Sequence, residues 1–404
     1  MPHFCGKITA MRVFRYATLF LMMPLLFSAS RCQTQTPPAL SGHISLRPGR
    51  RPVLYLVQPR SFEEIASNYA GLVVDSAVVQ ADGSFAFNRF EPPAAPVLLE
   101  LVIQPVPGRF PNKLIDDDPE KSNYLPLVVQ KGMPLRVKAE AEHFQATAMT
   151  EPFSADNQAL RQLRDIRRQA FGHSPAADEH VDEGTLMEQA TRLAQFRAPL
   201  MAFADTTASM WAALVAVRWV SPENDYERVP EFLSGQCIRW RERYPEHPFT
   251  AQLCRRAAPG KLPVMIGDTI PDVPLPMSDG DTLRLHTLLG ARLTLIDLWA
   301  SWCAPCRREN REVLAPLWAE YREAGLAIVG YALDSSPEAW QAAIRKDGAS
   351  WAQASHLGGD VSPFLEALRV TTIPANFLLD ADGKIVARNL HGQALKDFVR
   401  VFVQ

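Results

Sequence analysis

Hydrophobic and polar positions follow three different patterns along the chain. In residues 41–144 short apolar runs alternate with turn residues, and Asp82-Gly83 is a strong hairpin signal between two of these runs. In residues 151–258 the apolar positions recur at helical spacing. From Leu262 onward short apolar strands alternate with amphipathic helices. The chain is therefore expected to contain a β-rich region, a helical region and an α/β region in that order.

The β-rich region is predicted to contain short strands, and the helical region to contain several helices. Several short strands separated by turns are typical of a small β-sandwich. Residues 210–220 are apolar on nearly every side but are fewer than the roughly 20 that span a bilayer, so we expect a buried helix. The strands are expected at residues 53–57, 72–74, 75–80, 81–87, 97–103, 125–129 and 135–139, and further helices near 160–166, 186–200, 232–244 and 249–256.

The α/β region is predicted to form a mixed sheet covered by helices on both faces. It begins with a hairpin at residues 273–285, and Ser336 and Pro337 mark a helix start by their capping chemistry. The remaining strands are expected at residues 293–299, 326–333, 351–354, 375–379 and 384–388, and the helices at 306–323, 336–347, 362–368 and 393–402. The predicted fold is thus α/β at the C-terminus, preceded by a small β-sandwich-like domain and a helical spacer.

A length of 404 residues suggests two or three domains. The run Ala258-Pro259-Gly260-Lys261-Leu262-Pro263 marks the last boundary. The predicted segments are a signal at residues 1–32, a linker at 33–40, a β-rich domain at 41–150, a helical region at 151–260 and an α/β domain at 261–404.

The first 32 residues predict export. Lys7, Arg12 and Arg15 precede an apolar run at residues 17–27, and the small residues 28–30 suit cleavage. That run is shorter than the roughly 20 residues of a spanning helix, although an uncleaved anchor is an alternative. The mature protein is expected in the periplasm or cell envelope.

Cys32 raises the alternative of a lipoprotein signal. In that case Cys32 would become the acylated first residue and give the protein a lipid anchor. Arg31, however, stands where a lipoprotein signal needs a small residue. Soluble and lipid-anchored forms therefore both stay open.

Composition narrows the function classes. With 47% hydrophobic and 21% charged residues the chain is ordinary for a globular protein, and a net charge of −2 gives no case for nucleic acid as a partner. Glycine-rich phosphate loops are absent, and no metal or organic cofactor is suggested. Residues 116–118 and Glu120 fit a solvated acidic loop better than a calcium site.

The cysteines fall into three pairs along the sequence. Two of the six lie in the signal, and the other pairs are Cys237 with Cys254 and Cys303 with Cys306. An oxidising compartment permits a structural disulfide between Cys237 and Cys254, which lie on consecutive predicted helices. Two buried free thiols are the alternative, because spacing alone does not decide the pairing.

Cys303 and Cys306 form a CxxC motif between an apolar strand and a helix, as in thiol–disulfide oxidoreductases. A cysteine just before a helix faces unpaired N–H groups and the positive end of the dipole, which favour the thiolate. We therefore expect Cys303 to attack a disulfide and Cys306 to resolve the mixed disulfide. A zinc half-site is the alternative, but the chain has no second CxxC.

Asp297 lies within the apolar run Leu293-Thr294-Leu295-Ile296-Asp297-Leu298-Trp299. A carboxylate is costly in such a strand unless it has a partner or a role. It is the candidate proton acceptor for Cys306. The alternative is an Asp at the edge of a shorter strand.

The segment from Ile296 to Arg307 resembles the active site of thioredoxin-like proteins, and most closely that of exported TlpA/ResA-like thiol–disulfide reductases. Residues 371–380 resemble the cis-proline loop of this family, and 382–384 resemble the turn that follows it. The resemblance covers residues 262–404. It implies that Pro374 is cis and near Cys303, and that Trp302, Ile373 and Pro374 bind the substrate, with the Ile373 backbone pairing as an added strand. An ordinary trans proline is the alternative at Pro374.

Two positions depart from the family pattern. The family often has a proline five residues after the second cysteine, where this chain has Arg311 and a later Pro316, so the helix kink is either displaced or absent. Asp297 matches thioredoxin itself rather than some TlpA/ResA-like members, which leaves a redox potential taken from the family in doubt.

These observations predict an exported reductase of protein disulfides. The resemblance implies a disulfide-containing protein as substrate and a membrane thiol relay as electron donor, and it likens the β-rich part to accessory domains that precede TlpA-like domains. An oxidant or isomerase is the first alternative, since sequence does not fix the direction of exchange. A surface binding protein with a secondary redox domain is the second. A peroxidase is less favoured, because Cys303 lacks the Pro-x-x-x-Thr-x-x-Cys pattern.

Overall fold

The computed structural model describes residues 38–403 apart from 48, 50–51, 67–70, 105–117, 153 and 175–185. The predicted signal with Cys32 lies outside the described residues, as do Asp116 and Asp117. Within the described part, none of the helices combines the length and the apolar character that crossing a membrane requires.

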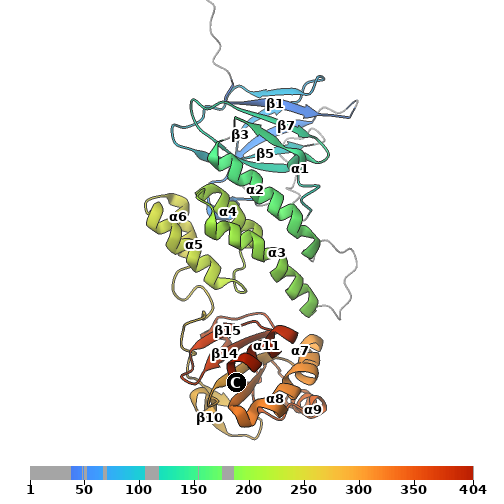
Figure 1. The fold of residues 1–404 in the computed structure, drawn as a ribbon, viewed down its shortest axis with the longest axis vertical. Helices are drawn as coiled ribbons and strands as arrows, with labels where there is room; N and C mark the ends of the chain where they lie inside the picture. The colour runs from blue at the N-terminus through green and yellow to red at the C-terminus, as the bar shows by residue number, and fades with distance from the viewer. Residues whose placement is uncertain are drawn as a thin grey trace, which may run out of the picture. The chain divides into compact units, whose positions relative to one another are not determined.

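Two four-stranded sheets form the β-rich part, in the orders β4-β1-β7-β8 and β3-β2-β5-β6. Apolar side chains from both sheets, such as Ile44, Leu56 and Leu101, meet in one core between them, which confirms the predicted sandwich. The strands are β1 (Leu40–Ser45), β2 (Val53–Gln58), β3 (Leu72–Val78), β4 (Ser84–Phe87), β5 (Val97–Gln104), β6 (Tyr124–Val129), β7 (Leu135–Glu140) and β8 (Met149–Glu151) (Figure 1).

Two short elements at the end of this part differ from the prediction. Helix α1 (Phe144–Thr147) and strand β8 follow β7, and β8 pairs antiparallel with β7 at the sheet edge. Elements of three or four residues carry no periodic pattern, so the sequence did not indicate them. Strand β3 also runs as one strand through residues 72–78, where we expected two runs.

Five helices follow, and their starts are set by local chemistry. The Ser154 and Ser209 side chains accept hydrogen bonds from backbone N–H groups in the first turns of α2 and α4, while Pro230 and Pro248 open α5 and α6. All of α4 is buried, as predicted. The helices are α2 (Ala155–Ala170), α3 (Leu186–Thr206), α4 (Met210–Val220), α5 (Pro230–Arg243) and α6 (Pro248–Arg256).

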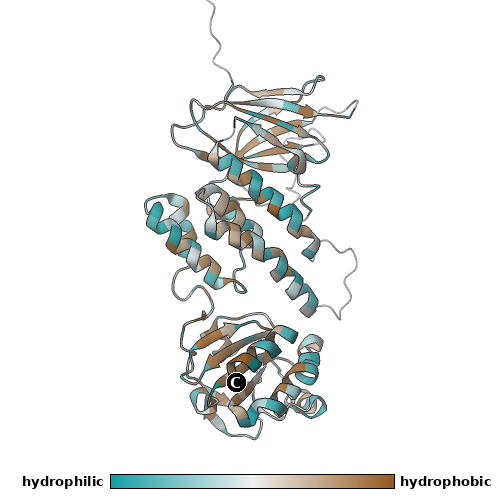
Figure 2. Cartoon of the chain, viewed as in Figure 1, coloured by the Kyte–Doolittle hydropathy of each residue, from teal (hydrophilic) through white to brown (hydrophobic). Residues whose placement is uncertain are grey.

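The helices and the β3-β2-β5-β6 sheet share one apolar core. Side chains on the sheet face opposite the sandwich core, including Val102 and Val128, belong to the same cluster as Leu214 of α4. Trp219 Nε1 donates to the Tyr124 hydroxyl at 2.7 Å across this contact. Strands β5 and β6 of this sheet are accordingly buried at nearly every position, and Figure 2 shows brown, hydrophobic stretches among the strands of the sandwich.

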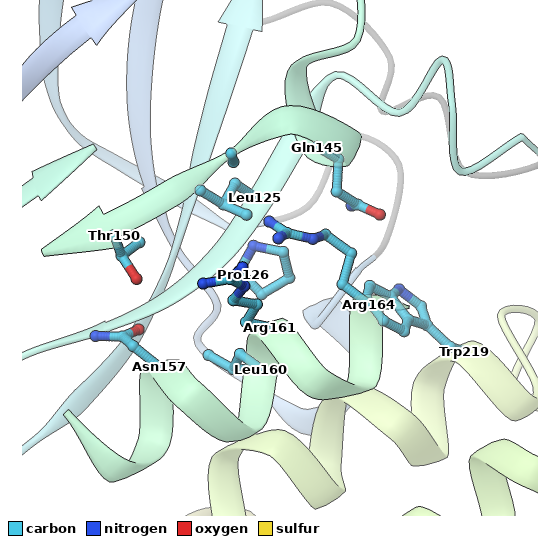
Figure 3. A pocket seen from close by; sticks show the side chains of 10 residues that line it. Leu125, Pro126, Gln145, Thr150, Asn157, Leu160, Arg161, Arg164 and Trp219 are labelled. Carbon is cyan, nitrogen blue, oxygen red and sulfur yellow. The ribbon is translucent and has the colours of Figure 1, made fainter. Parts of the chain in front are cut away.

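Two arginines lie inside the layer between sheet and helices. Arg218 is fully buried and its guanidinium donates to the carbonyl oxygens of Ile65, Ser221 and Pro222 at 2.9, 2.7 and 2.6 Å. These bonds offset the cost of burying its charge and fix the chain after α4. Arg164 lines a cavity of about 20 Å³ beside Trp219, with room for about one water. Figure 3 shows that β6, α1, β8, α2 and α4 supply side chains to its wall.

The C-terminal part is built on a five-stranded mixed sheet in the order β13-β12-β11-β14-β15. Strand β11 is central, parallel to β12 and antiparallel to β14. Apolar clusters cover both sheet faces, and the predicted mixed sheet with helices on both faces is confirmed. Its elements are β9 (Pro274–Pro276), β10 (Thr282–Arg284), β11 (Leu293–Trp299), α7 (Ala304–Glu309), α8 (Ala315–Tyr321), β12 (Leu326–Ala332), α9 (Pro337–Asp347), β13 (Ala352–Ala354), α10 (Pro363–Leu368), β14 (Ala375–Asp380), β15 (Ile385–Arg388) and α11 (Gly392–Val403) (Figure 1).

The helix after the CxxC motif contains a local irregularity. A π-helical segment, Asn310–Leu314, separates α7 from α8, and Pro316 lies in the first turn of α8. Because proline has no N–H, the regular hydrogen-bond ladder cannot continue through it. The irregularity therefore precedes Pro316 and includes Arg311, the position at which the family often has its proline.

The structure joins Cys237 of α5 to Cys254 of α6 by a disulfide with a sequence separation of 17 residues. A cross-link over a loop of this length restricts the unfolded chain, which stabilises the fold by about 3 kcal/mol. We expect Cys237→Ala/Cys254→Ala to lower the free energy of unfolding by about this amount in urea titrations. Comparison in a Cys303→Ser/Cys306→Ser background removes the second disulfide from the measurement. Equal stability of the two proteins would indicate free thiols at Cys237 and Cys254.

Candidate active site

Strand β11 leads the chain into the site. All seven of its residues are buried, and it pairs with β12 on one side and β14 on the other. At its end the Trp299 carbonyl accepts from the Leu333 N–H at 2.8 Å, and Trp299 Nε1 donates to Gln353 at 3.2 Å. The turn that follows is thus anchored by the centre of the sheet.

Cys303 is the N-cap residue of α7 and is joined to Cys306 by a disulfide. The Cys306 N–H points at Cys303 Sγ at 3.3 Å, and the Arg307 N–H bonds the Cys303 carbonyl at 3.0 Å. A sulfur in this position faces the unpaired N–H groups of a helix start, an environment that favours a thiolate once the disulfide is reduced.

The site combines a buried disulfide with an exposed aromatic ring. Cys303 and Cys306 are 5% and 2% exposed, whereas Trp302 is 68% exposed. A large apolar side chain held in water next to reactive sulfurs offers a contact for a partner molecule.

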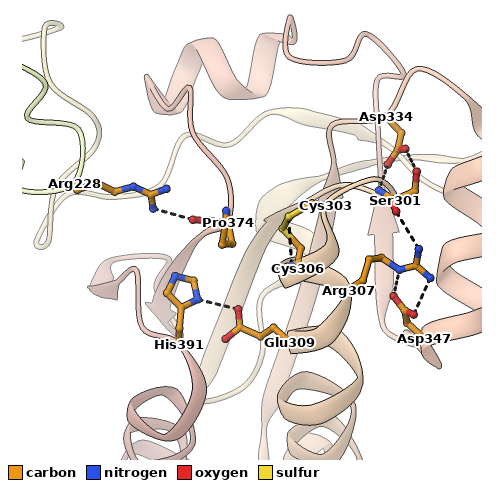
Figure 4. Close-up of a disulfide and its surroundings, with 10 residues drawn as sticks. All are labelled: Arg228, Ser301, Cys303, Cys306, Arg307, Glu309, Asp334, Asp347, Pro374 and His391. Carbon is orange, nitrogen blue, oxygen red and sulfur yellow. Dashed lines mark hydrogen bonds and ion pairs between the residues drawn. A yellow bond between two sulfur atoms is a disulfide. The ribbon is translucent and has the colours of Figure 1, made fainter. Parts of the chain in front are cut away.

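The loop before β14 brings Pro374 to the same end of the sheet. Ala375 lies opposite Leu298 in the antiparallel pair, so Pro374 comes next to the end of β11 from which the CxxC turn leaves. The Ile373–Pro374 peptide bond is cis. Ile373 packs against the apolar cluster that contains both cysteines, and Figure 4 shows Pro374 together with the disulfide.

Asp297 lies on β11 opposite Asn376 of β14 and is 4% exposed. Burial raises its pKa well above the usual range, and the negative charge of Glu309 raises the pKa further. A carboxyl group that holds its proton at unusually high pH is suited to exchange protons with a thiol.

Glu309 and His391 belong to the site and were not predicted. Glu309 stands one helical turn after Cys306 and is buried. Its carboxylate contacts His391 Nδ1 at 2.8 Å and accepts the Gly392 N–H at 3.1 Å (Figure 4). The three-residue spacing from Cys306 could have indicated Glu309, because residues i and i+3 share a helix face. His391 lies too far along the sequence for such a signal.

Arg307 fixes the turn rather than adding free positive charge. Its guanidinium donates to the Ser301 carbonyl at 3.0 Å and forms an ion pair with Asp347 of α9, which Arg311 also contacts at 2.9 Å. Asp334 accepts the Ser301 N–H at 2.9 Å from the other side.

Among the residues that the structure describes, no group of three or more His, Cys, Asp or Glu side chains is arranged to hold a metal.

Comparisons with known proteins agree with this geometry. Residues 266–388 match the model of the AhpC/TSA family. The chain is 24% identical over 139 residues to the thiol-disulfide oxidoreductase ResA of Bacillus thuringiensis subsp. konkukian, covering 34% of this chain and 77% of that protein. It is 27% identical over 114 residues to the thiol:disulfide interchange protein HelX of Rhodobacter capsulatus, covering 28% of this chain and 57% of HelX.

Solved structures match the same share of the chain. A thiol-disulfide oxidoreductase from Bacteroides fragilis is 35% identical, covers 33% of this chain and 98% of its own, and has a TM-score of 0.31. The C-terminal domain of a similarly titled protein from Bacteroides thetaiotaomicron is 30% identical, covers 34% and 96%, and has a TM-score of 0.33.

The raised pKa of Asp297 makes a prediction with a defined sign. A carboxyl whose folded-state pKa exceeds its unfolded value of about 3.9 costs no stability below that pH, and costs more as pH rises toward the folded pKa. Asp297→Asn should therefore unfold at higher urea concentration than wild type at pH 7, with the difference vanishing near pH 4. The exposed Asp360→Asn is the matched control. An equal difference at every pH would contradict the assignment.

The same substitution should slow the chemistry. Removing a general base typically costs 10²-fold or more, so we expect resolution of a Cys303 mixed disulfide to slow about a hundredfold in Asp297→Asn. Stopped-flow fluorescence of the reduced protein with a disulfide measures this step.

A Glu309→Gln protein should shift the acid limb of the pH–rate profile to lower pH, because loss of the Glu309 charge lowers the pKa of Asp297. An unchanged profile would argue against coupling of the two carboxyl groups.

Proposed function

Residues 266–388 form a thioredoxin-like domain of the AhpC/TSA family, and on this premise we propose that the protein is an exported thiol–disulfide oxidoreductase that reduces protein disulfides through Cys303 and Cys306. The observation that carries the proposal is the disulfide at the start of α7, with one cysteine as the N-cap and the cis Ile373–Pro374 bond at the same end of the sheet.

In the reductive direction the reaction has two exchanges. The Cys303 thiolate attacks one sulfur of the substrate disulfide, forming a mixed disulfide and releasing the other substrate sulfur as a thiol after it takes a proton. Cys306 then loses its proton and attacks Cys303 Sγ, which releases the second substrate thiol. Two electrons pass from the protein to the substrate, one proton comes from Cys306 and the other from solvent, and the Cys303–Cys306 disulfide is left.

Asp297 is proposed to accept the proton of Cys306 in the second exchange. Its burial keeps the carboxylate poorly solvated, so taking up a proton is favourable. Glu309 strengthens this tendency by its charge, and His391 and the Gly392 N–H hold Glu309 in place. The oxidised protein must then be reset by an external dithiol, which we propose is a membrane thiol relay.

The substrate is proposed to be a disulfide-containing protein. Trp302 supplies an exposed apolar contact, and the backbone of Ile373 next to Pro374 is suited to pair with an extended segment. The names of the relatives, thiol-disulfide oxidoreductase and thiol:disulfide interchange protein, support this class of reaction. A peroxidase is less favoured because the Pro-x-x-x-Thr-x-x-Cys pattern is absent around Cys303.

Location and organisation complete the proposal. The basic and apolar segment before Cys32 supports export to the periplasm or cell envelope, either soluble or with a lipid anchor at Cys32. Residues 41–150 and 151–260 are proposed as an accessory domain and a helical spacer that support a catalytic domain at 261–404.

The test is a redox titration of the mature protein followed by tryptophan fluorescence. Trp299 and Trp302 adjoin the CxxC motif, so their emission should follow its disulfide. We expect a two-electron transition with a midpoint near the thioredoxin value of about −270 mV. A midpoint near about −120 mV would make the protein an oxidant instead. The Cys303→Ser protein is the control, and a transition that persists in it would contradict the assignment of the redox pair.

A further inference from the structure

A carboxylate from the helical part contacts the cis-proline loop. Glu227 lies in the loop between α4 and α5, residues 221–229, far from Thr371 and Thr372 in the sequence. Its Oε2 accepts from the N–H and hydroxyl of Thr371 at 3.0 and 2.6 Å, and its Oε1 accepts from the same groups of Thr372 at 3.1 and 2.6 Å. Both oxygens of one carboxylate are thus used on two successive loop residues.

The next residue, Arg228, contacts the chain on the other side of Ile373. Arg228 Nη1 donates to the Pro374 carbonyl at 2.8 Å and to Asn389 Oδ1 at 3.1 Å (Figure 4). The buried Arg388 in turn donates to the Glu227 carbonyl at 2.9 Å. Adjacent residues of the 221–229 loop therefore hold the chain immediately before and immediately after Ile373.

The backbone N–H and C=O groups of Ile373 are available to pair with another molecule. Within the described part of the chain, no hydrogen bond involves the backbone N–H or C=O of Ile373. The threonines before it are exposed and lie outside the sheet, so their position depends on contacts such as those from Glu227. Hydrogen bonds to a charged acceptor are the stronger kind, and they order a loop that water would otherwise solvate.

We propose that Glu227 and Arg228 are positioning residues that hold the Ile373–Pro374 edge ready to pair with an extended polypeptide. This inference rests on the proposed function, since it concerns the substrate of the same dithiol. Ordering the edge in advance removes the entropy cost that the loop itself would otherwise incur when a polypeptide binds. A small disulfide, which makes no strand pairing, gains nothing from it.

A cleft beside these contacts extends the surface toward the helical part. It has a volume of about 610 Å³, and both Glu227 and Thr371 line it. Asp225, Arg255 and Lys261 also line it, so the surface next to the loop is polar and carries both charges. Such a surface suits a polypeptide segment, and Cys303 is not among the residues that line it.

The experiment compares two disulfides in single turnover. Reduced full-length mature protein is mixed with oxidised insulin or with hydroxyethyl disulfide, and tryptophan fluorescence gives the second-order rate constant for each. For Glu227→Gln we expect about a tenfold loss with insulin and less than about a twofold change with hydroxyethyl disulfide, because the amide cannot accept all four hydrogen bonds. Arg228→Gln should show the same selectivity.

Glu223→Gln is the matched control, because Glu223 is an exposed carboxylate of the same loop. It should leave both rates unchanged. Equal losses with both disulfides in Glu227→Gln, or no loss with insulin, would overturn the proposal. A faster reaction with insulin would overturn it too, since Glu227 would then act as a cover over the edge. A wild-type protein without Cys303-dependent exchange would instead refute the proposed function itself.

Two further measurements separate positioning from general damage. The midpoint potential of the Cys303–Cys306 pair should be the same in Glu227→Gln and wild type, because the variant leaves the surroundings of the sulfurs intact. Hydrogen exchange of the peptide that contains Thr371 and Thr372 should be faster in Glu227→Gln, while protection of β11 stays the same. Unchanged exchange at the two threonines would show that Glu227 does not order the loop in solution.

Discussion

The cost of keeping carboxylates away from water is the constraint on which the dithiol site depends. Asp297 is buried in the central strand, and Glu309 is buried one turn beyond Cys306. Burial and the nearby charge of Glu309 both raise the pKa of Asp297, so Asp297 keeps its proton more firmly than a carboxyl in water. The surrounding bonds from His391 and Gly392 fix Glu309, and the pairing of β11 on both sides fixes Asp297. The proposed proton acceptor, Asp297, and its neighbour Glu309 are thus held at fixed positions beside the cysteines.

How much of the site could be predicted depended on sequence distance. The CxxC turn and Asp297 were evident because a strand, a turn and a helix start are local patterns, and a charge within an apolar strand is conspicuous. Glu309 was missed because it stands among the polar residues of an amphipathic helix, although its spacing of three residues from Cys306 places both side chains on one helix face. His391 and Glu227 reach the site only through tertiary contacts. No periodicity links positions so far apart.

The fold shows the same division between local and tertiary information. Most strands and helices follow from alternation, capping residues and turns, and the C-terminal topology follows from their order. The packing of α4 on the sheet was not predicted, although one signal was present. Strand β5 is apolar at nearly every position, and a strand with only one covered face would alternate. A strand such as β5 that is apolar on both faces needs a layer of side chains on each face, and the following helices supply the second layer.

That second layer determines where the chain can be divided. Cutting between β8 and α2 would leave Leu98, Val102 and Val128 facing water on one broad sheet face. Exposed apolar area of this kind drives aggregation. The β-sandwich and the helices that follow it are therefore expected to unfold together. Evolutionary exchange of this part between proteins would have to move strands and helices together, with the joint in the proline- and glycine-containing run before Val264.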